Sequence, residues 1–276
     1  MSQFTLSAFA DEISPDPLEQ VSVLAQCGVK NIEFRSIHKT NVLDLSDAQI
    51  QEFKIVLKNH DCGLSAIGSP IGKIKADQPF EPHLTRFNRA MDLCEVFGTR
   101  NIRIFSYYLP EGSQWSQWKD EVFKRMETKV ALAQKRGLML FHENEHGIYG
   151  DSPDRVNELL VRFNGPCFKA AFDPANYVFC GFDPWEGWLK ARDYTAHFHA
   201  KDWVAGEKHG CLAGTGGGKF PAIINDMVAR NYHGFATLEP HLLGGGPTGG
   251  TTGPELFPKA VKTFKEILLH AGATVG

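Results

Sequence analysis

Short apolar runs recur along the whole chain and are separated by longer segments of mixed polarity. The runs lack helical spacing and stop at turn-forming or polar residues, which is typical of buried strands. This pattern predicts strands at residues 4–9, 29–34, 64–67, 101–105, 138–143, 168–172, 195–199 and 235–238.

The segments between these runs carry apolar residues at helical spacing and end at glycines such as Gly28, Gly98 and Gly137. Ser46 is expected to cap the second helix, and Ser152 with Pro153 to open another, because these residue types favour helix starts. Helices are predicted near residues 18–27, 47–62, 84–97, 115–136, 153–163, 184–189, 220–230 and 255–270.

Eight strands that alternate with eight helices, with no linker or break in composition, predict a parallel sheet, and the number of strands favours closure into a (β/α)₈ TIM barrel. We expect a single domain over residues 1–276. An open, doubly wound sheet is the alternative. It is disfavoured because the first strand leads into Ala10-Asp11-Glu12 rather than a glycine-rich phosphate loop, and Gly214–Gly218 does not join a strand to a helix. The segment Gly244–Gly253 is interpreted as a mobile loop after the last strand.

Composition and charge narrow the class of protein. The chain has 29 basic and 32 acidic residues, a net charge of −3, and no basic stripe, which argues against a nucleic-acid partner. Its six cysteines are scattered without a C-x-x-C pair, as buried thiols in a reducing compartment would be. With no signal-like N-terminus and no apolar run of membrane-spanning length, we expect a soluble cytoplasmic protein with no membrane partner.

The fifth predicted strand ends in a polar cluster that allows two interpretations. His142, Glu143 and His146 match H-E-x-x-H, which binds zinc when a helix places both imidazoles on one face. Here the motif follows an apolar strand and runs into Gly147, so this reading is disfavoured. A carboxylate at the buried end of a strand needs a cation, a donor or a proton, and Glu143 is therefore the anchor of the predicted site.

The last four strands each end in a residue type that binds metals. These residues are Glu143, Asp173, His199 and Glu239. The carboxyl ends of barrel strands face the same end of the molecule, so the four side chains should meet there. Three carboxylates and one imidazole suit one divalent cation, with Mn²⁺ first, Mg²⁺ and Co²⁺ next and Zn²⁺ possible.

Two neighbours of the predicted histidine ligand have open roles. His197 lies on the same face of its strand as His199, because side chains alternate, and is expected to be an inner-layer residue or a reserve ligand. Asp202 either orients a liganding imidazole from outside the ligand set or caps the next turn.

At this point the chain resembles the xylose-isomerase-like superfamily of TIM barrels, which includes the sugar phosphate isomerases and epimerases. The resemblance rests on Glu143 in HENEHGIYGD, Asp173 in FDPAN, His199 in HFHAKD and Glu239 in LEPHL. It implies that these four residues hold one divalent ion and that Glu143 and Glu239 also act as acid and base. It further implies a dimer or tetramer, although the sequence locates no interface.

The chain departs from the epimerase pattern at two positions. Asn176 stands where epimerases commonly have a histidine, and Ala205 where they have an arginine. These changes put the 3-epimerase substrate pose in doubt but leave the metal site intact. Polar residues of the loops are then the candidates for contacts with sugar hydroxyl groups: Glu12, Arg35, Tyr107, Glu145, His146, Asn176, Lys201 and His241.

The predicted chemistry starts with loss of a proton next to a ketone. A cation bound to the substrate oxygens stabilises the resulting enediolate, and two glutamates on opposite faces would remove and return the proton. We therefore predict a metal-dependent isomerase or epimerase acting on a free or modified keto-sugar. The alternative is a lyase or dehydratase that acts on a 3-keto-glycoside or keto-cyclitol. A DNA-repair endonuclease and a non-catalytic sugar-binding protein are less favoured, because of the charge balance and the complete ligand set respectively.

Overall fold

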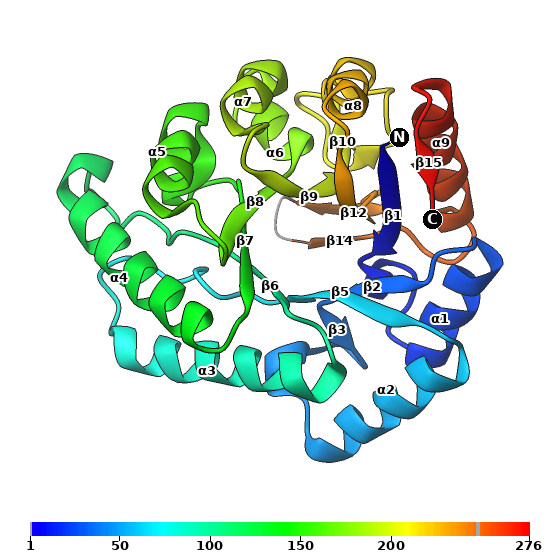
Figure 1. Ribbon diagram of the computed structural model, residues 1–276, viewed down its shortest axis with the longest axis horizontal. Coiled ribbons are helices and arrows are strands. Elements are labelled where there is room, and N and C mark those ends of the chain that lie inside the picture. The colour runs from blue at the N-terminus through cyan, green and yellow to red at the C-terminus, as the bar shows by residue number, and fades with distance from the viewer. Residues whose placement is uncertain (1, 247–248) are drawn as a thin grey trace.

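The computed structural model describes residues 2–246 and 249–276 and folds them around a closed barrel of parallel strands (Figure 1). The strands pair in the order β1, β2, β5, β6, β7, β8, β9 and β12, and β12 pairs back onto β1 to close the ring. This confirms the predicted (β/α)₈ barrel and excludes the open sheet. The barrel strands are β1 (Gln3–Ala8), β2 (Asn31–Phe34), β5 (Gly63–Gly68), β6 (Asn101–Ile104), β7 (Met139–Glu143), β8 (Phe168–Phe172), β9 (Thr195–Ala200) and β12 (His233–Leu238).

Helices form an outer ring around the strands (Figure 1). Ser46 caps α2 in a reciprocal capping box with Gln49, and Ser152 caps α5 with Pro153 at the first helical position, as predicted. The short helix α6 (Pro174–Phe179) is an addition that the sequence did not reveal. The ring helices are α1 (Pro17–Gln26), α2 (Asp47–Asn59), α3 (Phe80–Phe97), α4 (Trp115–Lys135), α5 (Pro153–Phe163), α7 (Pro184–Ala191), α8 (Phe220–Ala229) and α9 (Phe257–His270).

Short antiparallel pairs decorate the loops. They are β3 (Ser36–Ile37) with β4 (Thr40–Asn41), β10 (Asp202–Trp203) with β11 (Gly210–Cys211), and β13 (Gly244–Gly246) with β14 (Gly249–Thr251). The last pair lies where the sequence predicted a mobile loop, and Thr252 after it donates a hydrogen bond to Glu12 (2.7 Å). The described part of that segment is therefore paired and anchored, while Pro247 and Thr248, like Met1, lie outside the described residues. One further strand, β15 (Thr274–Val275), adds to β1.

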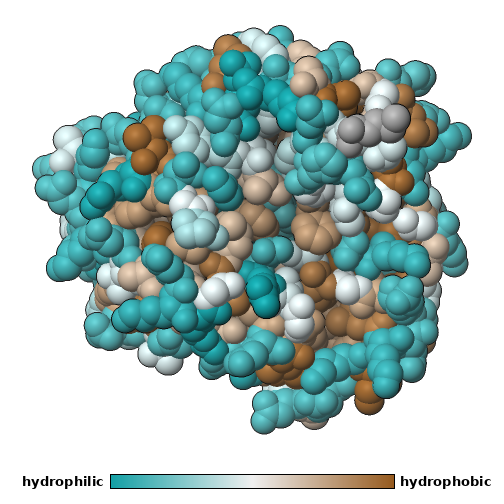
Figure 2. Space-filling model, viewed as in Figure 1, coloured by the Kyte–Doolittle hydropathy of each residue, from teal (hydrophilic) through white to brown (hydrophobic). Residues whose placement is uncertain are grey.

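Side chains on the two faces of the strands differ in kind. The faces toward the helices are apolar, as Phe198 and Ala200 on β9 illustrate, and they form one hydrophobic cluster. The alternate positions, which face the barrel interior, include Glu33, Arg103 and His197, all buried. Hydrophilic side chains dominate the periphery of the face shown in Figure 2, with hydrophobic ones between them nearer the middle. In the part of the chain that the structure describes, no helix has both the length and the apolarity to cross a membrane.

Lys129 of α4 is a buried ammonium outside the barrel interior. It is 0% exposed, and among the described residues its Nζ donates to the carbonyl oxygen of Phe105 alone (3.3 Å) and lies 4.5 Å from the ring centre of Tyr107. Burial, together with the nearby Arg125, lowers the pKa of Lys129 to about 7 from an ordinary value of 10.5. The unfolded chain therefore binds more protons than the folded protein between those two pH values.

We predict that Lys129→Met stabilises the protein at pH 7 and removes part of its pH dependence. The free-energy cost of burying the charged Lys129 is absent above pH 10.5 and grows as the pH falls toward 7. As the pH rises through this window, the free energy of unfolding of the wild type therefore increases by up to about 1.4 kcal/mol per pH unit because of Lys129 alone. Urea unfolding should show that the free energy of unfolding of the variant exceeds that of the wild type by roughly 2 kcal/mol more at pH 7.5 than at pH 9.5. The exposed Lys135 of the same helix gives the matched control, since Lys135→Met should follow the wild type. A constant difference at both pH values would contradict the prediction.

Candidate metal centre

Four side chains from the ends of consecutive barrel strands meet at the carboxyl end of the barrel. Glu143 closes β7, Asp173 follows β8, His199 lies near the end of β9 and Glu239 follows β12. One ligand atom of each lies within 4.8 Å of the others, and all four residues are buried. From His199 Nδ1 the distances are 3.4 Å to Glu143 Oε1, 3.8 Å to Asp173 Oδ2 and 3.9 Å to Glu239 Oε2. The four predicted ligands are thus brought together, and this group could hold a metal ion.

The donor atoms suit a divalent cation. Ligands about 2.1 Å from a cation lie about 3–3.4 Å from one another, so the observed spacings need only a small contraction. Among the described residues, neither the buried His199 Nδ1 nor Asp173 Oδ2 has a hydrogen-bond partner, although Asp173 Oδ2 forms ion pairs with Lys201 (2.7 Å) and with His199 (3.8 Å). A cation would satisfy a buried ring nitrogen that lies beside three carboxylates without a hydrogen-bond partner.

Basic side chains hold the carboxylates of the cluster, both on oxygens that face away from His199 and on oxygens that face it. Arg103 donates to Glu143 Oε2 (2.7 Å), which leaves Oε1 for the cluster, where Asn176 Nδ2 also reaches it (3.2 Å). Arg35 donates to Glu239 Oε1 (2.8 Å), and Lys201 Nζ lies 3.1 Å from Glu239 Oε2 and 2.7 Å from Asp173 Oδ2. Each carboxylate is therefore fixed in one orientation before any ligand arrives.

These neighbours keep the two glutamates ionised. Burial acts to raise the pKa of Glu143, but His199 and Arg103 outweigh it and hold the pKa well below the ordinary value. For Glu239, burial is likewise outweighed, mainly by Lys201 and His241, and the pKa falls to about 2. Both carboxylates are thus available as proton acceptors near neutral pH.

Behind the cluster, Glu33 of β2 connects two histidines inside the barrel. Its Oε2 lies 2.7 Å from His197 Nε2 and 3.1 Å from His199 Nε2. Burial acts to raise the pKa of Glu33, yet the two imidazoles lower it below its ordinary value. His197 also approaches Thr237 Oγ1 (2.8 Å), so it is a hydrogen-bonded inner-layer residue, one carboxylate away from His199.

The structure places Asp202 against the glycine-rich segment, and not against an imidazole or the turn that follows it among the described residues. Its carboxylate accepts hydrogen bonds from the backbone N–H groups of four residues and from no imidazole among the described residues: Trp203, Gly214, Gly216 and Gly218. The glycines are required because a Cβ on Gly216 or Gly218 would lie 2.5 or 2.7 Å from Asp202 Oδ1. The glycine-rich segment therefore wraps a carboxylate of its own chain, and the prediction that Asp202 orients a liganding imidazole is wrong.

Three of the predicted substrate contacts lie against the cluster, in addition to Asn176. Arg35 and Lys201 touch its carboxylates directly, and His241 Nε2 lies 3.9 Å from Glu239 Oε1. The other ring nitrogen of His241 is held by Glu12 (2.6 Å), and Nε2 is buried without a hydrogen-bond partner among the described residues. His241 therefore has one polar atom free to meet a ligand.

Two further predicted contacts lie at the rim. Glu145 is buried and pairs with Lys73 (2.9 Å), and because burial outweighs that pairing, its pKa rises to about 6. His146 is exposed, with its ring 5.1 Å from that of Phe179.

The structure does not bring Tyr107 or His142 to the cluster. Tyr107 packs against Lys129 and His83, on the helical side of the wall, so it is placed away from the predicted sugar site. His142 bonds Ser106 (2.9 Å), and burial lowers its pKa to about 3. Since Met139–Glu143 is a strand, the H-E-x-x-H zinc interpretation fails for the reason given by the sequence.

The sequence analysis missed Glu33, Arg103 and Lys73. Glu33 and Arg103 each occupy the inward position of a strand between two apolar residues, in NIEF and NIRI. A charge in the middle of a buried strand needs a partner of opposite charge or a hydrogen bond. Because side chains alternate along a strand, the sequence alone could have placed these two charges on the inner face of the barrel. Lys73 lies in an irregular loop, where the sequence carried no comparable signal.

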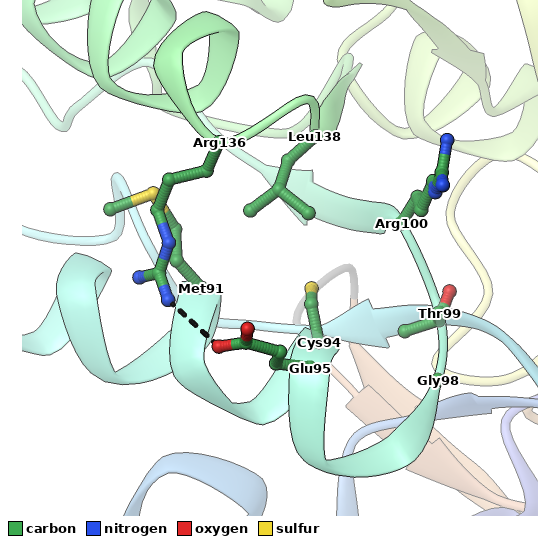
Figure 3. A pocket seen from close by; sticks show the side chains of 8 residues that line it. All are labelled: Met91, Cys94, Glu95, Gly98, Thr99, Arg100, Arg136 and Leu138. Carbon is green, nitrogen blue, oxygen red and sulfur yellow. Dashed lines mark hydrogen bonds and ion pairs between the residues drawn. The ribbon is translucent and has the colours of Figure 1, made fainter.

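A separate cavity of about 280 Å³ opens at the other end of the barrel, where β6 and β7 begin (Figure 3). Its charged lining includes Arg136, paired with Glu95 (3.4 Å), while Arg100 points away from the other side chains in this view. The thiol of Cys94 has its pKa raised to about 12 by burial, so it is not a nucleophile near neutral pH. The cavity offers no group for the predicted chemistry.

Comparisons with solved structures agree with this architecture. The chain is 17% identical to a xylose isomerase-like TIM barrel protein from Mycobacterium smegmatis in complex with magnesium, with a TM-score of 0.74 and 97% of each chain covered. It is 18% identical to a probable 3-DHS dehydratase from Bacillus anthracis (TM-score 0.73; 96% of this chain, 99% of that one). It is 14% identical to a 3-keto-D-glucoside 4-epimerase from E. coli (TM-score 0.71; 96% and 99%).

Identities of 14–18% show a shared fold alone. A search of curated proteins finds no match. The family model described as the xylose isomerase-like TIM barrel, however, matches residues 21–267, which is most of the sequence. The chain therefore belongs to the xylose isomerase-like TIM barrel family.

Proposed function

We propose that this protein is a divalent-metal-dependent isomerase or epimerase of keto-sugars. The observation that carries the proposal is the buried group of Glu143, Asp173, His199 and Glu239, whose donor atoms converge. Similarity to a magnesium-containing barrel and to a 3-keto-D-glucoside 4-epimerase supports it. We propose Mn²⁺ as the first candidate metal, because carboxylate and imidazole ligands suit it, with Mg²⁺, Co²⁺ and Zn²⁺ as alternatives.

In this proposal the chain supplies the proton transfer. A bound divalent cation would stabilise negative charge that develops on the substrate oxygens. Glu143 and Glu239 are the proton carriers, because both are ionised and both border the same small volume. If the glutamate that takes the proton also returns it to the neighbouring carbon, the reaction is an isomerisation. If the other glutamate returns it to the opposite face, the reaction is an epimerisation.

Hydrogen-bonding groups around the cluster would orient the sugar. His241 Nε2 is the clearest of them, since it is buried, unpartnered among the described residues and close to Glu239. Lys201 and Arg35 border the same volume, and Asn176, Glu145 and His146 are proposed to complete the set.

The charges favour an uncharged substrate. Four basic side chains surround the cluster, and each already has a carboxylate partner: Arg35 with Asp11 and Glu239, Lys73 with Glu145, Arg103 with Glu143, and Lys201 with Asp173 and Glu239. A phosphate group would have to break such a pair to gain a cation of its own. A free sugar or a neutral glycoside needs only hydroxyl contacts.

A lyase or dehydratase is the second candidate. The similarity to a probable 3-DHS dehydratase favours it, as do Asn176 and Ala205 at positions where epimerases that the chain resembles have histidine and arginine. Loss of a proton beside a ketone is common to both reactions. A leaving group at the next carbon would turn the same intermediate toward elimination.

The metal site predicts a stabilisation by Mn²⁺ that depends on Asp173. A cation at 100 times its dissociation constant adds about 2.7 kcal/mol, which should raise the melting temperature by roughly 5–10 °C. Asp173→Asn should abolish this shift, because the variant loses the charge of one ligand. His146→Asn is the matched control and should keep the shift, since His146 is exposed and outside the cluster. An equal shift in the wild type and Asp173→Asn would refute the assigned ligands.

The acid/base assignment predicts hydrogen exchange into the substrate. With Mn²⁺ and a panel of ketoses and 3-keto-glycosides in deuterated water, we expect deuterium at the carbon next to the ketone, followed by NMR and mass spectrometry. Glu143→Gln should slow this incorporation by roughly 10²–10⁴-fold. Retention of all substrate groups supports the isomerase or epimerase, whereas release of water or an aglycone moves the protein to the lyases.

Because the basic side chains are already paired, we predict that a phosphate group on the sugar lowers kcat/KM. For any ketose that the protein converts, we expect kcat/KM for its phosphate ester to be at least roughly tenfold lower, because one of the ion pairs must be broken. Competition between the two sugars in one reaction, read by mass spectrometry, measures the ratio directly. A preference for the ester would show that one of the four basic side chains is free to bind phosphate.

A further inference from the structure

In the part of the chain that the structure describes, Glu33 is the one carboxylate that contacts the ring of His199 from the side opposite the cluster. The ring is fully buried, with Nε2 3.1 Å from Glu33 Oε2 and Nδ1 facing Glu143, Asp173 and Glu239. An ionised carboxylate only accepts hydrogen bonds, so the imidazole nitrogen that faces Glu33 must carry a proton. The nitrogen that faces the cluster is then the one that can offer a lone pair.

We infer that Glu33 is the positioning residue of this centre, because its carboxylate holds the Nε2 proton of His199 and thereby directs the Nδ1 lone pair at the cation. The inference rests on the proposed function, since it concerns one of the four proposed ligands. Histidines that bind metals commonly donate their second ring N–H to a carboxylate, which fixes the tautomer and strengthens the ligand. Here the donor and the acceptor come from β9 and β2.

The packing around His199 does not determine which ring nitrogen carries the proton, so the hydrogen bond to Glu33 does. Phe9 meets the ring edge to face at 5.3 Å between centroids, and His197 does so at 5.4 Å. These contacts fix the plane of the ring. They do not distinguish one nitrogen from the other, whereas a carboxylate on one side does.

Glu33 is itself held in place from two directions. His197 Nε2 approaches the same oxygen at 2.7 Å, and Arg103 Nε lies 3.8 Å from Oε1. Arg103 also donates to Glu143 Oε2 (2.7 Å), so Glu33 is connected to two of the four ligands, His199 directly and Glu143 through Arg103. Moving the Glu33 carboxylate should therefore disturb the nitrogen ligand and one oxygen ligand together.

The role can be measured as Mn²⁺ affinity in the absence of any substrate. Glu33→Gln preserves the size of the side chain but removes its negative charge, and it leaves one neutral carbonyl oxygen as the only acceptor for the Nε2 proton. Isothermal titration calorimetry should show the dissociation constant for Mn²⁺ rising by roughly 10–100-fold. Glu33→Asp keeps the charge and should recover part of the loss.

Thr237→Val is the matched control. Thr237 Oγ1 lies in the same buried layer and bonds His197 (2.8 Å), with no hydrogen bond to His199 among the described residues. This variant should bind Mn²⁺ as the wild type does. Equal weakening in Thr237→Val and Glu33→Gln would overturn the inference, because the effect would then reflect general loosening of the interior. Unchanged affinity in Glu33→Gln would overturn it as well.

A second measurement uses the wild type, so it tests the inference even if Glu33→Gln does not fold. Long-range ¹H–¹⁵N spectra of the zinc-loaded wild type should show a slowly exchanging proton on His199 Nε2 and none on Nδ1. A proton on Nδ1 instead would overturn the assignment. Tight Mn²⁺ binding by the wild type with no effect of Glu33→Gln refutes only the role of Glu33, whereas a wild type that binds neither Mn²⁺ nor Mg²⁺ refutes the proposed metal-dependent function itself.

Discussion

The structure depends on the pairing of charges inside a barrel that excludes water. Glu33, Arg103, Glu143 and Lys201 are each at most 5% exposed, and an isolated charge at such a depth would cost several kcal/mol. Every one of them therefore has an opposite charge or an imidazole within about 3 Å. Because the partners come from different strands, β2, β6, β7 and β9 must keep their register for the charges to stay paired.

This pairing explains why the site is organised without a ligand. Each carboxylate of the cluster has one oxygen committed to a basic side chain or to a backbone N–H group, so few rotamers remain open to it. Asp173 shows the principle, since its Oδ1 accepts the N–H of Asn176 at the start of α6 while Oδ2 faces His199 and Lys201. The short helix that the sequence did not reveal thus has a function in the site, because it fixes the orientation of a proposed ligand.

The sequence predicted the barrel and the four converging residues because both follow from short-range patterns. Strand periodicity gave the fold, and the end of each strand marked the residues that meet at one edge. What it did not predict was pairing across the barrel: no spacing along the chain relates Glu33 to His199, or Arg103 to Glu143. The role of Asp202 was misjudged for a similar reason, since its partners are backbone N–H groups of a loop that becomes adjacent only after folding.

The two departures from the epimerase pattern acquire a physical meaning in the structure. Asn176 donates its amide N–H groups to Glu143 Oε1 and to the carbonyl oxygen of Asn144, so it helps to hold the Glu143 carboxylate in place. The side chain of Ala205 carries no polar atom. In the proposed function, Arg35, Glu12 and His241, from the loops after β2, β1 and β12, would add substrate contacts from the opposite wall. The proposed chemistry would then lie on β7, β8, β9 and β12, while the strands on either side of the barrel closure would supply part of the proposed substrate contacts, because the buried Nε2 of His241 is one of them.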